Sequence, residues 1–427
     1  MTSASEIAMA KPRHRTPAAG AHHQCAPAAI LSSVQSAKVA HTVDVAGCDV
    51  LGEALATVMP AWGITVAKAR ASEAPGGADR SAICQEGDGT YCFQSCWGES
   101  PLTGLGIAGA TCGAVADLIQ AYVDARPDVL GLHCGAIRIG GHLVAFTGSY
   151  RAGKSTLVTR LASETGCALF CDDILPVDAA GTAMALGVQP RLRLPLPDGV
   201  TPAFREEVAG RLTVKDHRYG YVRNPGQAPF GTRAPLAAMV VLRRQDGARA
   251  RLHRLPTSQA AAFLIRQNIA DPGDPEAHYD RISSLAEGLV CLTLVYCDLE
   301  EAVALVRSTF WATEIPRHET PLGPALPVEE PDERAQPADL SAHYARAGDV
   351  ITRRIGDDTF LWQMKGRNFF SLNPIGGAIW TLLELPQSGT DIATTLHEVF
   401  PETPAPSINH DVAKLLGQLQ DRGLVVH

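Results

Sequence analysis

At 427 residues the chain is too long for one typical domain, and its length predicts two or three domains. Its composition, 46% hydrophobic and 19% charged, is that of a globular protein with enough apolar side chains for sizeable cores. The formal net charge of -8 argues against nucleic acid or an anionic membrane surface as the main partner, and no apolar run reaches the roughly 18 residues that a membrane-spanning helix needs.

The 11 cysteines are odd in number and scattered along the chain. Cys92 and Cys96 are four positions apart, but no second pair has the spacing of metal ligands. Several others fall in apolar stretches, where a buried thiol is the usual state of a cysteine. We therefore expect free thiols in a reducing, cytoplasmic setting.

The N-terminal third contains no motif with an evident chemistry. Residues 1–24 are small, polar and basic, which predicts a disordered arm, with a mitochondrial-type targeting segment as the alternative. Residues 25–128 alternate short apolar runs with Gly/Asp turns and end in a helical pattern, with Val115, Leu118 and Ile119 at helix spacing. The pattern predicts a small α+β lobe.

A strand, a Gly140-Gly141 turn and a second strand then lead to the stretch "TGSYRAGKST". Gly148, Gly153, Lys154 and Ser155 fit the pattern G-x-x-x-x-G-K-S/T, in which successive backbone N–H groups cradle phosphates. Lys154 is expected to reach the β- and γ-phosphates, and the Ser155 hydroxyl to hold Mg²⁺. The motif predicts ATP and Mg²⁺ as cofactors. The expected nucleotide-binding residues are Gly148, Ser149, Tyr150, Arg151, Ala152, Gly153, Lys154, Ser155 and Thr156.

Two adjacent acids, Asp172 and Asp173, follow the next predicted strand. One carboxylate can approach Mg²⁺ while the other orients an incoming hydroxyl and takes its proton. Arg191 and Arg193, in "PRLRLPLP", lie on one face of an extended segment, either bracing phosphoryl oxygens or forming a solvated strand face. A lone histidine such as His133 is by itself most often a packed core residue.

Further apolar runs and helical patterns complete a P-loop catalytic domain over residues 129–312. Residues 313–338 are rich in Pro and acidic side chains, a linker composition. In residues 339–427, two strands around a Gly-Asp-Asp turn are followed by three helical patterns. A hairpin with three short helices predicts a winged helix-turn-helix module.

Residues 133–193 together resemble the HPr kinase family, and the likeness extends more loosely to Ala312. The resemblance implies an α/β fold with a P-loop kinase core of the HPr kinase type, in which His133 contacts the catalytic aspartate. It assigns acceptor-serine activation to Asp172, metal or loop support to Asp173, and charge stabilisation to Lys154, Arg191 and Arg193. HPr kinase proper carries a Glu-Ile-Arg-Gly type segment after the Asp pair. The stretch "VQPRLRLPLP" has no glutamate, which predicts a one-way kinase without phosphorylase activity.

The C-terminal module resembles the PqqD-like peptide-recognition domain in "FFSLNPIGGAIWTLLEL", "TDIATTLHEVF" and "DVAKLLGQLQDRGLV". That resemblance implies that the leader of a ribosomally made precursor peptide binds as an added strand beside a helix. We expect an exposed edge near Phe360 and Trp362, with the third helix as the wall. The expected peptide-binding residues are Phe360, Trp362, Val412, Leu415 and Leu416, although several of these apolar side chains must form the module core.

Charge decides between a peptide and DNA as the partner of a winged helix. The module carries seven Lys plus Arg against ten acids, and a net acidic surface lacks the counterion-release contribution to DNA affinity. We therefore expect a serine kinase of a precursor peptide, without nucleic acid or membrane as partner. The alternatives are a kinase of a folded carrier protein such as HPr and a non-catalytic, nucleotide-gated peptide chaperone. Nucleotidyl transfer and a homo-oligomeric state are left open.

Overall fold

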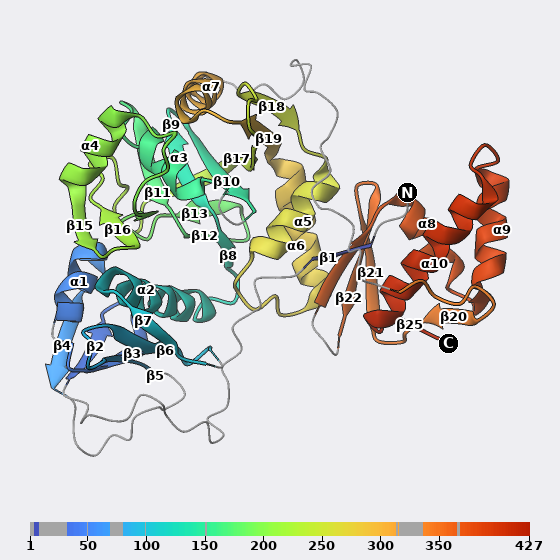
Figure 1. Cartoon of the computed structure of the whole chain (residues 1–427), viewed down its shortest axis with the longest axis horizontal. Coiled ribbons are helices and arrows are strands. Elements are labelled where there is room, and N and C mark those ends of the chain that lie inside the picture. Colours follow the sequence, from blue (N-terminus) through green and yellow to red (C-terminus); the bar gives the residue numbers. More distant parts are fainter. Residues whose placement is uncertain are drawn as a thin grey trace.

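The computed structural model describes residues 32–48, 50–68, 80–98, 100–149, 152–312, 315, 336–364 and 368–427, together with the backbone of residues 4–7. These residues form a mixed α/β structure with several sheets (Figure 1). No helix within the described ranges is both long enough and apolar enough to cross a membrane.

The N-terminal part is a six-stranded sheet with the order β4-β2-β3-β5-β6-β7 (Figure 1). Its elements are β2 (Ser32–Ser36), β3 (Val39–Ala46), α1 (Val50–Val58), β4 (Ile64–Lys68), β5 (Arg80–Gln85), β6 (Tyr91–Gln94), β7 (Leu102–Leu105) and α2 (Ile107–Asp124). Helix α2 packs on the sheet, as expected for an α+β lobe. The buried Trp62 donates a 2.8 Å hydrogen bond from Nε1 to the carbonyl of Leu186, which ties this part to the central one.

The central part is built on a large mixed sheet with the order β11-β9-β10-β17-β13-β12-β8, extended by β19 beside β17 and by β18 beside β19. Its strands are β8 (Leu130–His133), β9 (Gly135–Ile139), β10 (His142–Gly148), β11 (Cys167–Cys171), β12 (Ile174–Val177), β13 (Thr182–Met184), β17 (Arg233–Arg244), β18 (Arg251–Arg254) and β19 (Val290–Tyr296). Strands β10, β17 and β19 run parallel and are almost continuously apolar, as is typical of strands covered on both faces.

Two pairs of helices cover the two faces of this sheet. Successive β10 residues alternate between them, so that Phe146 joins the core cluster under one pair and Ala145 the cluster under the other. The first pair is α3 (Lys154–Leu161) and α7 (Leu299–Trp311), and the second is α5 (Thr257–Gln267) and α6 (Pro275–Gly288). A small sheet lies beside α4 (Pro202–Arg211) and consists of β14 (Arg191–Arg193), β15 (Leu212–Lys215) and β16 (Tyr219–Val222).

The C-terminal module contains the two strands and three helices expected from its sequence (Figure 1). Its main sheet has β21 (Val350–Ile355), β22 (Asp358–Gln363) and β23 (Asn368–Leu372), and its helices are α8 (Pro374–Leu382), α9 (Gly389–Val399) and α10 (Ala405–Asp421). A second small sheet joins β20 (His343–Arg346), β24 (Gln387–Ser388) and β25 (Val425–Val426). Asn373 caps α8 by accepting a 2.8 Å hydrogen bond from the Gly376 N–H, and Pro374 occupies the first turn.

The module is docked on the central part through α5 and α6. Phe360, Trp362 and Phe369 point from its main sheet into the core cluster that contains these helices. The Tyr279 ring of α6 lies 5.6 Å from the Phe369 ring and 6.3 Å from the Phe360 ring, in edge-on contacts. His278, next along α6, is fully buried 5.6 Å from the Phe369 ring. An aromatic interface therefore fixes the module against the central part.

One short strand comes from the far end of the chain. Ala4–Ile7, within the segment expected to be disordered, forms β1 and pairs antiparallel with β23 (Figure 1). The order of this sheet is β1-β23-β22-β21, so β22 is an inner strand. The expectation of an exposed edge at Phe360 and Trp362 is therefore wrong, because β22 is paired on both sides.

Candidate functional site

The loop expected to bind phosphates runs from the end of β10 into α3, the strand-to-helix setting that its motif requires. Gly148 and Gly153 have φ of 150° and 95°, which favour glycine. A Cβ on Gly153 would lie 2.6 Å from the Tyr296 hydroxyl, which itself donates a 2.8 Å hydrogen bond to the carbonyl of Ala152. Tyr296, at the end of β19, therefore supports the loop at Ala152 and Gly153. Tyr150 and Arg151, two of the expected nucleotide-binding residues, lie outside the described residues.

The two aspartates lie where a long antiparallel ladder is interrupted. Strand β11 pairs with β9, and after Asp172 and Asp173 the chain continues as β12, which pairs with β8. The register on either side is the same, with Cys171 opposite Ala136 and Ile174 opposite His133, and the Cys134 N–H donates a 2.9 Å hydrogen bond to the Asp173 carbonyl. The two aspartates and His133 line the same cavity as the loop of residues 148–155.

Asp172 lies beside Ser155, the loop residue expected to hold Mg²⁺. Its Oδ2 accepts a 2.9 Å hydrogen bond from the backbone N–H of Arg191, and it accepts a second from the Ser155 hydroxyl. Burial raises the pKa of Asp172 above its ordinary value, although these hydrogen bonds oppose the rise. Its Oδ1 is buried without a hydrogen-bond partner among the described residues. A hard cation held by Ser155 would supply a partner for that oxygen, so the residues fit Mg²⁺.

Asp173 is paired with the histidine. The Nε2 of His133 lies 3.1 Å from the Asp173 Oδ1, and both side chains are more than a third exposed. Burial acts to raise the pKa of Asp173, but the hydrogen bond and charge of His133, with Arg191 and Lys154, lower it below its ordinary value. The contact expected between His133 and Asp172 is thus made with the neighbouring carboxylate instead, because His133 lies opposite Ile174 in the ladder.

The cationic side chains surround these acids. Lys154 Nζ lies 3.4 Å from the carbonyl of Gly148, and burial lowers the pKa of Lys154. For Arg191, burial acts to lower the pKa, but Cys112, Tyr221 and the two aspartates outweigh it and raise the pKa. The guanidinium groups of Arg191 and Arg193 lie 4.5 and 5.8 Å from the Tyr219 ring centre, while Leu192 between them is buried. The two arginines therefore share one face, as their spacing predicts.

These side chains line one cavity of about 830 Å³. All the described residues expected to bind nucleotide or take part in catalysis line it: His133, Gly148, Ser149, Ala152, Gly153, Lys154, Ser155, Thr156, Asp172, Asp173, Arg191 and Arg193. The lining residues that the sequence did not mark as part of a site include Cys112 and Val115 of α2, and Arg266 and Gln267 of α5. They come from distant segments that only the folded chain brings to the loop. The N-terminal part and α5 therefore help to form the cavity wall.

The five residues expected to bind peptide are core residues. Phe360 and Trp362 are 0% and 2% exposed and face the central part, while Val412, Leu415 and Leu416 are at most 1% exposed within the module core. None of these side chains presents a surface to an incoming peptide, so this part of the expected site is wrong. Alternation and helix spacing identify a buried face, and both of these faces are used for packing.

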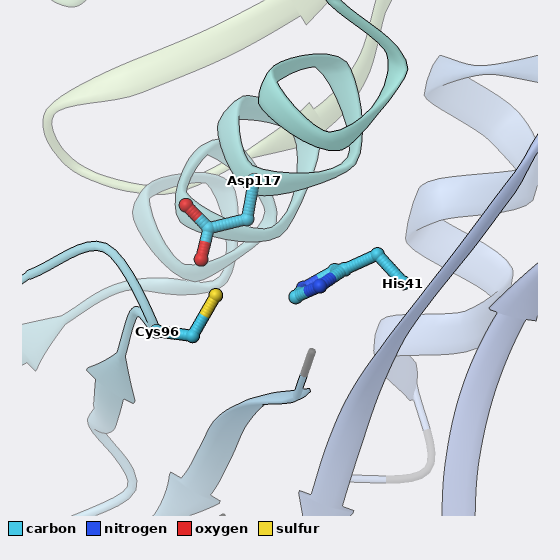
Figure 2. A group of neighbouring side chains, drawn as sticks. All are labelled: His41, Cys96 and Asp117. Carbon is cyan, nitrogen blue, oxygen red and sulfur yellow. The ribbon is translucent and has the colours of Figure 1, made fainter. Parts of the chain in front are cut away.

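A second polar group lies in the N-terminal part. Figure 2 shows His41 of β3, Cys96 and Asp117 of α2 pointing toward one another, with one ligand atom of each within 4.8 Å of the others. The Asp117 carboxylate accepts hydrogen bonds from Ser81 at 2.5 Å and Ser95 at 2.9 Å, and His41 Nε2 lies 3.1 Å from the Ser81 hydroxyl. These bonds compensate the burial of Asp117 and tie α2 to the sheet.

Comparison with known proteins identifies the C-terminal region. Residues 359–425 match the family model described as Coenzyme PQQ synthesis protein D (PqqD), so the chain contains a PqqD-like domain. A solved structure described as "TbiB1 in Complex with the TbiA(beta) Leader Peptide" is similar over 19% of this chain and 93% of that chain, with 22% identity and a TM-score of 0.18. No curated protein matches the sequence.

Proposed function

We propose that the protein is an ATP-dependent serine kinase of a ribosomally synthesised precursor peptide, which its PqqD-like domain recognises. The observation that carries the catalytic half is the meeting of a phosphate loop, two aspartates and two arginines on one cavity. This combination suits phosphoryl transfer, in which positioning and charge stabilisation supply most of the catalysis. The resemblance to HPr kinases supports the same reaction class.

The loop side of the cavity would hold Mg·ATP, which supplies the transferable γ-phosphoryl group. Backbone N–H groups of the loop and the N-terminal end of α3 would bind the phosphates, and Lys154 would neutralise their charge. Ser155 and Asp172 would hold the metal ion, since their side chains are already hydrogen-bonded to each other. This arrangement gives Asp172 the role expected from sequence for Asp173.

Asp173 would then face the acceptor. Its carboxylate is kept ionised by His133 and is more accessible than a metal-bound one, so it can accept a hydrogen bond from a serine hydroxyl. The serine oxygen forms a bond to the γ-phosphorus while the bond to the β,γ-bridging oxygen breaks, and the serine proton passes to Asp173. Arg191 and Arg193 stabilise the charge on the transferred group. The products are a phosphoserine and ADP.

The PqqD-like domain indicates that the substrate is a peptide. It is packed against α5 and α6, and α5 also carries Arg266 and Gln267 to the cavity wall. A peptide held on the module would therefore be presented from a fixed position near the cavity. This geometry also favours a peptide over a folded carrier protein, which would need no separate recognition module.

The test uses the full-length protein, Mg·ATP and synthetic peptides encoded next to the gene, with intact-mass analysis of each peptide. We expect one or more additions of a phosphoryl group, all abolished by Lys154→Ala and by Asp173→Asn. A nucleotide-sized addition would change the reaction to nucleotidyl transfer. Tight peptide binding that depends on ATP but never changes the peptide mass would instead establish the chaperone alternative.

A further inference from the structure

Strand β1 occupies one edge of the PqqD-like sheet. Its residues pair antiparallel with β23, from Ala4 opposite Leu372 to Ile7 opposite Phe369. Because the sheet order is β1-β23-β22-β21, β1 covers the edge of β23 that would otherwise carry unpaired N–H and C=O groups (Figure 1). We call the main chain of residues 369–372 on this side the β23 edge.

The surroundings of β1 are those of a bound peptide. It lies in contact with α10 of the module and with α5 of the catalytic part, so a strand and helices enclose it. Side chains of β23 on both faces of the sheet are buried, with Phe369 and Phe370 at most 1% exposed. An extended segment beside a strand and a helix is the arrangement in which main-chain hydrogen bonds give affinity with little demand on sequence.

We infer that β1 is the chain's own occupant of the peptide site at the β23 edge, and that a peptide substrate binds there by displacing it. The inference rests on the proposed peptide recognition. It follows from the geometry of a ladder, since one strand edge can pair with only one partner strand at a time. It also assigns the peptide site to main-chain atoms of β23 in place of the buried side chains expected from sequence.

Two properties make β1 exchangeable. It has only four residues, so few main-chain hydrogen bonds hold it. Residues 8–31 join it to β2, and a chain of that length can reach about 80 Å when extended, which allows β1 to leave without disturbing the lobe. A covalently attached segment competes at an effective concentration in roughly the millimolar range. An external peptide must therefore bind well to replace it, and weak, unrelated peptides are excluded.

The test measures fluorescence anisotropy of a labelled synthetic peptide with the sequence of residues 1–12, MTSASEIAMAKP. Three proteins are compared: the full chain, a chain lacking residues 1–31, and the full chain with Ser5→Pro and Glu6→Pro. Neighbouring residues of an antiparallel strand alternate in the direction of their N–H groups, so two adjacent prolines remove at least one bond to β23. Ala18→Pro with Ala19→Pro is the matched control, since it adds two prolines to the arm outside β1.

We expect saturable binding to the truncated chain and to the Ser5→Pro/Glu6→Pro chain, and binding at least about tenfold weaker to the full chain and the control. A peptide of the same composition in scrambled order measures the contribution of sequence. Absence of arm-peptide binding to both opened proteins, with circular dichroism unchanged, would overturn the inference.

Competition then separates this inference from the proposed function. If the substrate peptide displaces the labelled arm peptide, both stand. A second outcome is that the arm peptide binds, and the substrate peptide is phosphorylated at a normal rate but does not displace it. Substrate recognition then lies elsewhere, so the displacement inference is wrong and the kinase proposal stands. If the arm peptide is displaced by a peptide that is never phosphorylated, the kinase proposal fails and the shared site stands.

Discussion

Asp172 and Asp173 are neighbours in sequence, yet their carboxylates have different surroundings. Asp172 is bonded to Ser155 and the Arg191 backbone, whereas Asp173 is paired with His133. The sequence predicts that two such acids divide the roles of metal ligand and acceptor base. The residues alone leave open which acid has which role, and the resemblance to HPr kinases assigns acceptor activation to Asp172. The structure favours the reverse, because the register of β8 against β12 pairs His133 with Asp173.

We predict that the two Asn substitutions separate these roles. Asp172→Asn should weaken Mg²⁺-dependent nucleotide binding and raise the Mg²⁺ concentration needed for half-maximal activity by tenfold or more, because one metal ligand loses its charge. Asp173→Asn should leave Mg·ATP affinity within about twofold and lower the transfer rate by roughly 10²-fold or more. Nucleotide titrations at several Mg²⁺ concentrations, with peptide assays, measure both. The opposite pattern would restore the assignment expected from sequence.

A second residue-scale prediction concerns the glycine beneath Tyr296. Gly153→Ala should abolish nucleotide binding, because the new Cβ would lie 2.6 Å from the Tyr296 hydroxyl and the loop would have to shift. Gly231→Ala is the matched control, since Gly231 also has positive φ, 88°, but nothing lies near its Cβ. Isothermal titration with ATP compares the two. Because Gly231 does not line the cavity, equal loss in both variants would mean that general destabilisation of the fold, and not contact with Tyr296, is responsible.

His278 gives a pH prediction. Burial first, and then the charge of Arg281, lower the pKa of His278 from 6.5 to about 4. Below pH 6.5 the unfolded chain binds a proton at His278 that the folded chain does not bind. The contribution of neutral His278 to the free energy of unfolding is therefore fully present above pH 6.5 and is lost as the pH falls toward 4. Urea denaturation should show that the stability of wild type falls by about 2 kcal/mol more than that of His278→Leu between pH 7.5 and 5. Equal falls would show that the ring is protonated in the folded state.

At the scale of elements, the packing of β22 against α6 is the feature that could not be predicted from the sequence. Alternation in "DTFLWQM" correctly predicts a strand with one apolar face, but it cannot say whether that face meets a peptide, a partner or the rest of the chain. Strand β1 could not be predicted either, because it has only four residues and its partner β23 lies at the other end of the chain. The strand, loop and helix around Gly148 and Lys154 were predictable, because the whole motif lies within eight consecutive residues.

The interface prediction follows from the burial of Trp362. Trp362→Ala should lower the free energy of unfolding by about 3–5 kcal/mol, since it opens a cavity against Tyr279 and Phe369. Met364→Ala, two residues along and 47% exposed, should change it by at most about 0.5 kcal/mol. Urea denaturation measures both. A small loss for Trp362→Ala would mean that the module unfolds independently of the central part.

At the scale of the whole molecule, three distant segments meet around one cavity and one sheet edge. Helix α2 of the N-terminal part contributes to the cavity wall, α5 reaches both the cavity and β1, and β1 returns from the start of the chain to the C-terminal module. This arrangement links the β23 edge to the proposed phosphoryl-transfer site through a single helix, α5. The parts of the chain are therefore packed against one another, and are not separate units joined only by a linker.

The most direct test of the central claim follows the labelled phosphorus of ATP into the peptide. Full-length protein is incubated with its peptide substrate and either γ-labelled or α-labelled ATP, with Asp173→Asn in parallel. We predict that only the γ-label reaches a peptide serine, and that Asp173→Asn transfers none. Label from the α-position would establish nucleotidyl transfer, and no label from either position, with ATP and peptide both bound, would contradict a kinase altogether.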